Sequence, residues 1–165
     1  MAGRTAWVAG NGAGYTWTNM FATADLNALA NGSSVMSSAT AIANQTNQDQ
    51  FADVSLVITN TVTPTAGANI ALYIAPLAAD GSTYGDGNFT AGTQKTTYTP
   101  FWMAEQSVQI QSGSSITKMI AYFKGIILPP VSFRWLLLNA TGQSFSSTNA
   151  NNLAQFITYN QNNNN

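Results

Sequence analysis

The 165-residue sequence contains no cysteine and no histidine, and only 7% of its residues are Asp, Glu, Lys or Arg. Without cysteine there is no disulfide and no thiolate metal site. Without histidine the commonest general base and the commonest metal ligand are both missing. A serine nucleophile would have no histidine to activate it, so hydrolase chemistry of the Ser-His-Asp or Cys-His kind is excluded.

The few acidic residues give an enzyme little support. Glycosidases need two facing carboxylates, and most of the six acids lie in segments that are typical of loops or strand starts. The glycine-rich strings Gly10–Gly14 and Asp80–Gly87 lack the Gly-Lys-Ser/Thr ending of a phosphate loop. We predict a protein with no catalytic residues, no cofactor and no metal. A calcium loop built from Asp80, Asp86 and Asn88 stays open as an alternative to plain turn chemistry.

The charge pattern argues against nucleic acid and membranes as partners. The net charge is −1, and the five basic residues form no run. No apolar run is long enough to cross a bilayer, and the N-terminus lacks the pattern of a signal peptide. A surface with so little charge repels neighbours weakly and suits dense packing against other protein chains.

Alternation of apolar and polar residues predicts an all-β fold. Val54, Leu56 and Ile58 share one face of a strand, and the segment 70–75 repeats the pattern, so we expect two adjacent antiparallel strands. Thr23 is expected to cap a short turn at 24–30. Further strands are expected within Val35–Ile42, Ser107–Gln111, Ile116–Phe123, Val131–Asn139 and Leu153–Tyr159.

Seven or eight short strands with turns between them are typical of an antiparallel β-sandwich, and we favour a jelly-roll-like arrangement. The expected domain organisation is an extended N-terminal arm over residues 1–20, a β-sandwich domain over 21–160, and a disordered polar tail over 161–165. Aromatic residues near the arm are candidates either for docking onto a neighbouring subunit or for packing on the chain's own sheets. An exposed sugar-binding platform is a third possibility. The candidate interface residues are Arg4, Trp7, Tyr15, Trp17 and Phe21, with the turn at Pro129 and Pro130 as a second choice.

Four strings in sequence order resemble a family of small virion proteins of tailed bacteriophages, the head decoration or cement proteins. None of them is a catalytic signature, and the likeness rests on their order and their strand-and-turn pattern. The strings are FATADLNALANGSSVMSS (21–38), QDQFADVSLVI (48–58), ALYIAPLAADGSTYGDG (71–87) and GIILPPVSFRWLLLNATGQSF (125–145).

The resemblance implies a non-enzymatic β-sandwich subunit on the capsid surface of a virion. Its partners would be the major capsid protein and further copies of itself, as a dimer or trimer, and it would bridge and stabilise capsomers. The stretches before Thr16 and after Tyr159 depart from the family's pattern, so the mode of attachment is open. A receptor- or carbohydrate-binding β-sandwich of a phage tail or fibre is the alternative, and a depolymerase ranks last.

Overall fold

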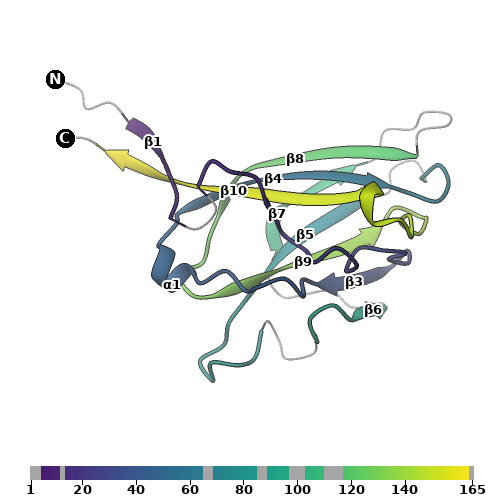
Figure 1. Ribbon diagram of the computed structural model, residues 1–165, viewed down its shortest axis with the longest axis horizontal. Coiled ribbons are helices and arrows are strands. Elements are labelled where there is room, and N and C mark those ends of the chain that lie inside the picture. Colours follow the sequence, from purple (N-terminus) through teal and green to yellow (C-terminus); the bar gives the residue numbers. More distant parts are fainter. Residues whose placement is uncertain are drawn as a thin grey trace.

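The computed structural model describes residues 5–11, 14–64, 69–84, 89–96, 103–109 and 117–163. The described strands form two antiparallel sheets, which confirms the predicted all-β class (Figure 1). The first sheet has the order β1 (Thr5–Ala9), β10 (Asn152–Asn163), β4 (Phe51–Thr59) and β8 (Lys118–Ile127), and β2 (Thr18–Asn19) also pairs with β10. The second sheet has the order β6 (Gln94–Thr96), β3 (Ser33–Met36), β9 (Phe133–Ala140), β5 (Asn69–Pro76) and β7 (Met103–Gln109). One helical turn, α1 (Asn44–Asn47), and one 3-10 turn (Asn149–Asn151) complete the elements of the described residues.

The strand pairs are nested along the chain. β5 pairs with β7, β4 with β8, β3 with β9, and both β1 and β2 with β10. Of the three further pairs, β3 with β6 adds an edge strand to the second sheet. The other two, β4 with β10 and β5 with β9, close this long folded hairpin into two layers. Every one of these pairs is antiparallel.

The core lies between the sheets and follows the alternation of the strands. In β4 the even-numbered residues 52–58 are fully buried, while the odd-numbered ones face the other side. Phe133 and Trp135 of β9 meet edge to face with their ring centroids 5.3 Å apart, and Trp135 also contacts Phe156 of β10. Burial of a large apolar side chain stabilises a fold by about 1.5–3 kcal/mol. This layer therefore dominates the stability of the domain.

The second sheet also has an apolar outer face, and the chain covers it itself. Met36, Tyr73 and Leu136 form a separate buried cluster on that side. Tyr84, Phe89 and Ala91, from the long connection between β5 and β6, pack against it. The centre of the outer face of the second sheet, around Met36, Tyr73 and Leu136, is thus removed from water.

The expected pairing of the two central strands is wrong. β4 and β5 lie in different sheets, because the chain crosses from one layer to the other between them. The neighbours of β4 are β8 and β10, which lie far along the sequence. Apolar alternation gives the face of a strand but carries no information on its distant partners.

Both termini differ from the expected arm and tail. Residues 5–9 form β1, which pairs with residues 159–163 of the same chain, so no free arm is seen in this part of the chain. β10 continues to Asn163, which makes most of the expected polar tail a strand; Asn164 and Asn165 are outside the described residues. β1 and the end of β10 project side by side from one end of the molecule (Figure 1). Backbone pairing between β1 and β10 stabilises this strand. The polar side chains of the segment give no indication of that pairing.

Candidate functional site

The outer face of the first sheet carries large apolar side chains that remain in contact with water. Ile120 and Ile127 of β8 are 73% and 68% exposed. The register aligns Ile120 with Val57 and Leu153, and it aligns Ile127 with Phe51 and Tyr159. Two apolar rows therefore run across β8, β4 and β10 on the side away from the core. We call this surface, together with Trp7, Trp17 and Tyr122, the outer apolar face.

Aromatic rings extend the outer apolar face over the sheet edge. The Trp7 ring of β1 meets Tyr159 and Phe51 edge to face, at centroid distances of 5.1 and 5.8 Å. Phe51 and Tyr159 stack on each other at 5.6 Å. Trp17, just before β2, contacts Tyr122 of β8 at 5.9 Å. Trp7 and Trp17 are still 56% and 39% exposed, so a further surface can cover them.

One carboxylate lies within this face and orders two of its rings. Asp53 sits at an irregularity in the β4–β8 register. The hydroxyl of Tyr122 donates to its Oδ2 at 3.0 Å, and the hydroxyl of Tyr159 donates to its Oδ1 at 2.9 Å. The backbone N–H of Gly125, which has φ +67°, donates to the same Oδ1 at 2.9 Å. Glycine adopts this backbone conformation without strain, which allows the close approach.

The tyrosine hydroxyls are held in their neutral form. Burial, followed by the hydrogen bond to Asp53 and the charge of that carboxylate, raises the pKa of Tyr159 to about 12. The same causes raise the pKa of Tyr122. Both hydroxyls donate to Asp53, and the raised pKa values keep them neutral to a higher pH than ordinary tyrosines.

The two sheets differ in how their outer faces are covered. The connection that bears Tyr84 and Phe89 covers the second sheet, whereas no described segment covers the rows of Ile120 and Ile127. A whole large side chain has a surface of roughly 150–250 Å². Scaled by their exposed fractions, the exposed side chains of the outer apolar face together present on the order of 600 Å² of surface to solvent. The largest patch on a typical monomer is about 300–600 Å². A standard protein interface buries about 800 Å² on each partner, so this face approaches the area of an interface.

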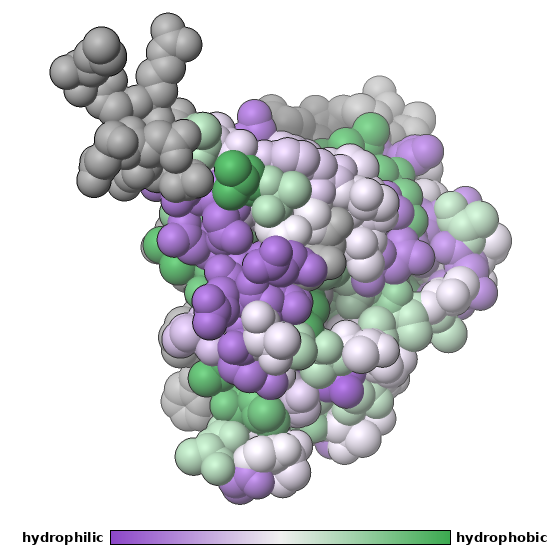
Figure 2. Space-filling model, turned by 60° about the vertical axis from the view of Figure 1, so that its left-hand side comes forward, coloured by the Kyte–Doolittle hydropathy of each residue, from purple (hydrophilic) through white to green (hydrophobic). Residues whose placement is uncertain are grey.

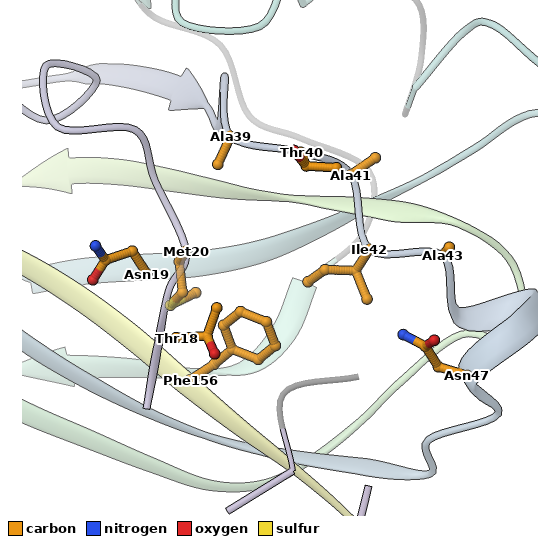
Figure 3. A pocket seen from close by; sticks show the side chains of 10 residues that line it. All are labelled: Thr18, Asn19, Met20, Ala39, Thr40, Ala41, Ile42, Ala43, Asn47 and Phe156. Atoms are coloured by element: carbon orange, nitrogen blue, oxygen red, sulfur yellow. The ribbon is translucent and has the colours of Figure 1, made fainter. Parts of the chain in front are cut away.

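A pocket of about 450 Å³ opens at the neighbouring edge, between β2 and the segment 39–43. Met20, Ile42 and the ring of Phe156 form its apolar lining (Figure 3). Thr18, Thr40 and Asn47 add polar groups, and no charged side chain lines the pocket among the described residues. The lining suits an apolar side chain flanked by hydrogen-bonding groups.

Figure 2 turns toward the viewer the end of the molecule from which β1 and the end of β10 project in Figure 1, and hydrophilic residues gather there. This end includes α1 and its neighbours, and amides make many of its contacts. Gln161 donates its backbone N–H to Oε1 of Gln50 at 2.9 Å, and Gln50 donates its own to Oδ1 of Asn160 at 2.7 Å. The amides tie the projecting strands to the body without using charge.

The interface residues expected from the sequence divide into two groups. Trp7 and Trp17 lie on the outer apolar face, and Tyr15 is 56% exposed beside them in the sequence. Phe21 is buried in the core, so it packs on the chain's own sheets. Pro129 is buried and Pro130 exposed, and Arg4 lies outside the described residues.

Sequence reasoning missed the centre of the face. Ile120, Tyr122 and Ile127 have the alternation of an ordinary strand, which does not tell which of its two faces meets the core. The sequence hinted at the face only in that β8 carries large residues on both of its sides. Such a pattern is typical of a strand that is covered on both sides. The role of Asp53 could not be predicted from the sequence, because its hydrogen-bond donors come from the distant strands β8 and β10.

No family model, curated protein or solved structure matches the chain. Within the described ranges there is no group of three or more His, Cys, Asp or Glu side chains that could hold a metal ion. Asp80 accepts hydrogen bonds from its own turn, and Asp86 and Asn88 of the alternative calcium loop are outside the described residues. No described helix is long and apolar enough to span a membrane.

Proposed function

We propose that the chain is a jelly-roll subunit that binds other protein chains and has no catalytic activity. The nested strand pairs support this fold. In chain order β2, β3, β4, β5, β7, β8, β9 and β10 divide into the groups β2-β10-β4-β8 and β3-β9-β5-β7. Jelly rolls are double-sheet folds of eight strands with two Greek keys, and viral capsid proteins and lectins use them.

We further propose that it is a virion structural protein, a decoration or cement protein on the outside of a capsid shell. The observation that carries this proposal is the outer apolar face, which approaches the area of a standard interface and has no cover among the described residues. The resemblance of the four sequence strings to phage head decoration proteins supplies the setting. The partners would be the major capsid protein and further copies of the chain.

The mechanism needs only differential binding. A subunit that binds the expanded shell more tightly than its precursor shifts the equilibrium toward the expanded state by mass action. Binding through apolar and aromatic surface, with only 7% charged residues in the chain, depends little on salt. The pocket between β2 and the segment 39–43 would accept an apolar anchor from the neighbouring subunit.

Co-sedimentation with purified expanded and precursor shells tests the proposal. We expect saturable binding to expanded shells, and at least tenfold weaker binding after Ile120→Thr combined with Ile127→Thr, since about 1.4 kcal/mol is tenfold in affinity. Val62→Thr is the matched control, because Val62 is 52% exposed but lies outside the face. Absence of binding to either shell would reject the decoration role.

A receptor- or carbohydrate-binding role is the second candidate. Trp17 and Tyr122 are exposed aromatic rings, and the amide of Gln155 donates to Oδ1 of Asn19 at 3.1 Å beside them. Aromatic rings next to amides are suited to sugars. A glycan array that shows binding lost on Trp17→Ala, together with no binding to shells, would favour this role.

A further inference from the structure

The outer side of the second sheet holds a half-buried cation with no acidic partner among the described residues. Arg134 lies on β9 between Phe133 and Trp135, which face the core, so its own side chain faces outward. A cavity of about 320 Å³ lies beside it. We propose that Arg134 and this cavity form a binding site for a small carboxylate with an apolar or sugar-like body. This site is separate from the outer apolar face, which lies on the first sheet.

The guanidinium group is held in one orientation. Its Nη1 donates to the carbonyl oxygen of Ser37 at 2.9 Å and also to that of Ala39. Its central carbon lies 5.1 Å from the centroid of the Tyr84 ring, a cation–π contact. These contacts use one nitrogen and one flat side of the group.

The opposite edge of the guanidinium carries donors that have no acceptor among the described residues. In the described part of the chain Arg134 donates only through Nη1, which leaves the N–H groups of Nε and Nη2 without a protein acceptor. These two nitrogens form the fork that binds the two oxygens of a carboxylate in parallel. Because the side chain is already fixed by Ser37, Ala39 and Tyr84, little rotamer entropy is lost when a ligand binds.

The cavity limits the rest of the ligand. Its walls combine apolar surface with hydroxyl groups, and its volume suits a body of one ring. The apolar wall is made by Met36, Phe89 and Ala91, and the polar wall by Ser82, Thr83 and Tyr84.

Asp80, the acidic residue of the neighbouring turn, does not bind the Nε and Nη2 donors of Arg134. Asp80 accepts the backbone N–H groups of Ser82 and Thr83 at 3.0 and 2.9 Å and the Thr83 hydroxyl. These hydrogen bonds, that of the Thr83 hydroxyl first, lower the pKa of Asp80 to about 2. Its carboxylate is thus ionised and engaged within its own turn. Asp86 of the same connection is outside the described residues.

Nuclear magnetic resonance titration of the ¹⁵N-labelled full chain tests the proposal with sodium glucuronate and sodium benzoate. Glucose serves as the uncharged control. We expect saturable shifts of the Arg134 Nε–H signal and of the amides of Ser82 and Tyr84 with at least one carboxylate, and none with glucose. The Nε–H signal is read in the unmodified protein, so the test does not depend on a variant that folds.

A pair of variants tests the fork. Arg134→Lys keeps the positive charge but loses the paired donors, and we expect at least tenfold weaker binding. Lys124→Gln removes a charge from the first sheet and should leave binding unchanged. Unchanged amide signals of β4 and β10 show that Arg134→Lys folds. The proposal is overturned if neither carboxylate gives saturable shifts, or if Lys124→Gln weakens binding as much as Arg134→Lys does.

Discussion

The hydroxyl of Tyr159 on β10 donates a 2.9 Å hydrogen bond to Oδ1 of Asp53 on the neighbouring strand β4. This contact joins the aromatic rings of the outer apolar face to the only described carboxylate within that face. Replacing Asp53 by Asn removes the charge, while the burial of the ring, which is the larger cause, remains. We therefore expect the pKa of Tyr159 to fall from about 12 but to stay above 10.0. Titration of tyrosinate absorbance measures it, with Tyr159→Phe to assign the signal, and an unchanged highest pKa would contradict the contact.

The raised pKa of Tyr159 also predicts how stability depends on pH. The folded state keeps the phenol neutral, whereas the unfolded chain loses the proton near the ordinary value of 10.0. Its contribution to the free energy of unfolding is thus complete below pH 10.0 and is lost as pH rises to about 12. Urea unfolding at increasing pH should show this loss, and Tyr159→Phe should flatten the curve in that window. Equal slopes for the two proteins would contradict the prediction.

The outer apolar face should not be needed for folding. Ile120 and Ile127 are mostly exposed, and threonine retains the β-branched shape that strands favour. Replacing both by Thr should change the free energy of unfolding by no more than about 1 kcal/mol, while it reduces self-association in sedimentation velocity at high concentration. A loss of several kcal/mol would mean that these side chains pack within the chain.

Asp25 should be essential to the local structure around the turn after β2. It is 6% exposed and accepts the N–H groups of Ala22 at 3.0 Å and Ser38 at 2.6 Å, and the Ser38 hydroxyl at 2.6 Å. Asp25→Ala leaves these donors without their acceptor and should cost about 2–3 kcal/mol. Thr23→Ala, at the residue that the sequence suggested as the cap, is the exposed control and should cost about 0.5 kcal/mol or less. Chemical denaturation compares them; equal costs would refute this role of Asp25.

The attachment of β1 should depend on a close approach at Gly10. A Cβ atom there would lie 2.4 Å from Oγ1 of Thr158 and 2.7 Å from Oδ1 of Asp49. The backbone N–H of Asn11 donates to this same Asp49 oxygen at 2.6 Å. Gly10→Ala should therefore release β1 from β10 and speed amide hydrogen exchange in residues 6–9, with β4 as the internal control. Exchange that stays the same would mean that β1 is already detached in solution.

Local patterns in the sequence were sufficient to find most strands and the class of the fold. Strict alternation in 54–58 and 70–74 marked β4 and β5, and the inward residues were assigned correctly. The pairing of these strands was not accessible, because β4 meets Phe123 and Phe156 through contacts of long sequence separation. The strand content of 5–9 and 161–163 was missed because each segment forms a strand only by pairing with the other.

The candidate site was accessible only in part. Trp7 and Trp17 were singled out as candidates for an interface, and the structure places both on the outer apolar face. Phe21 belonged to the same stretch, yet it is buried, since a run of aromatics in sequence does not fix the direction of each side chain. Arg134 gave no signal at all, because its environment is built from β3, β9 and a distant connection.

Cryo-electron microscopy of particles that carry this protein tests the central proposal most directly. We expect density for a two-sheet subunit on the shell, with the outer apolar face around Ile120 and Ile127 in contact with the neighbouring protein. A subunit on the shell with this face open to solvent, or particles without the subunit on their shell, would contradict it.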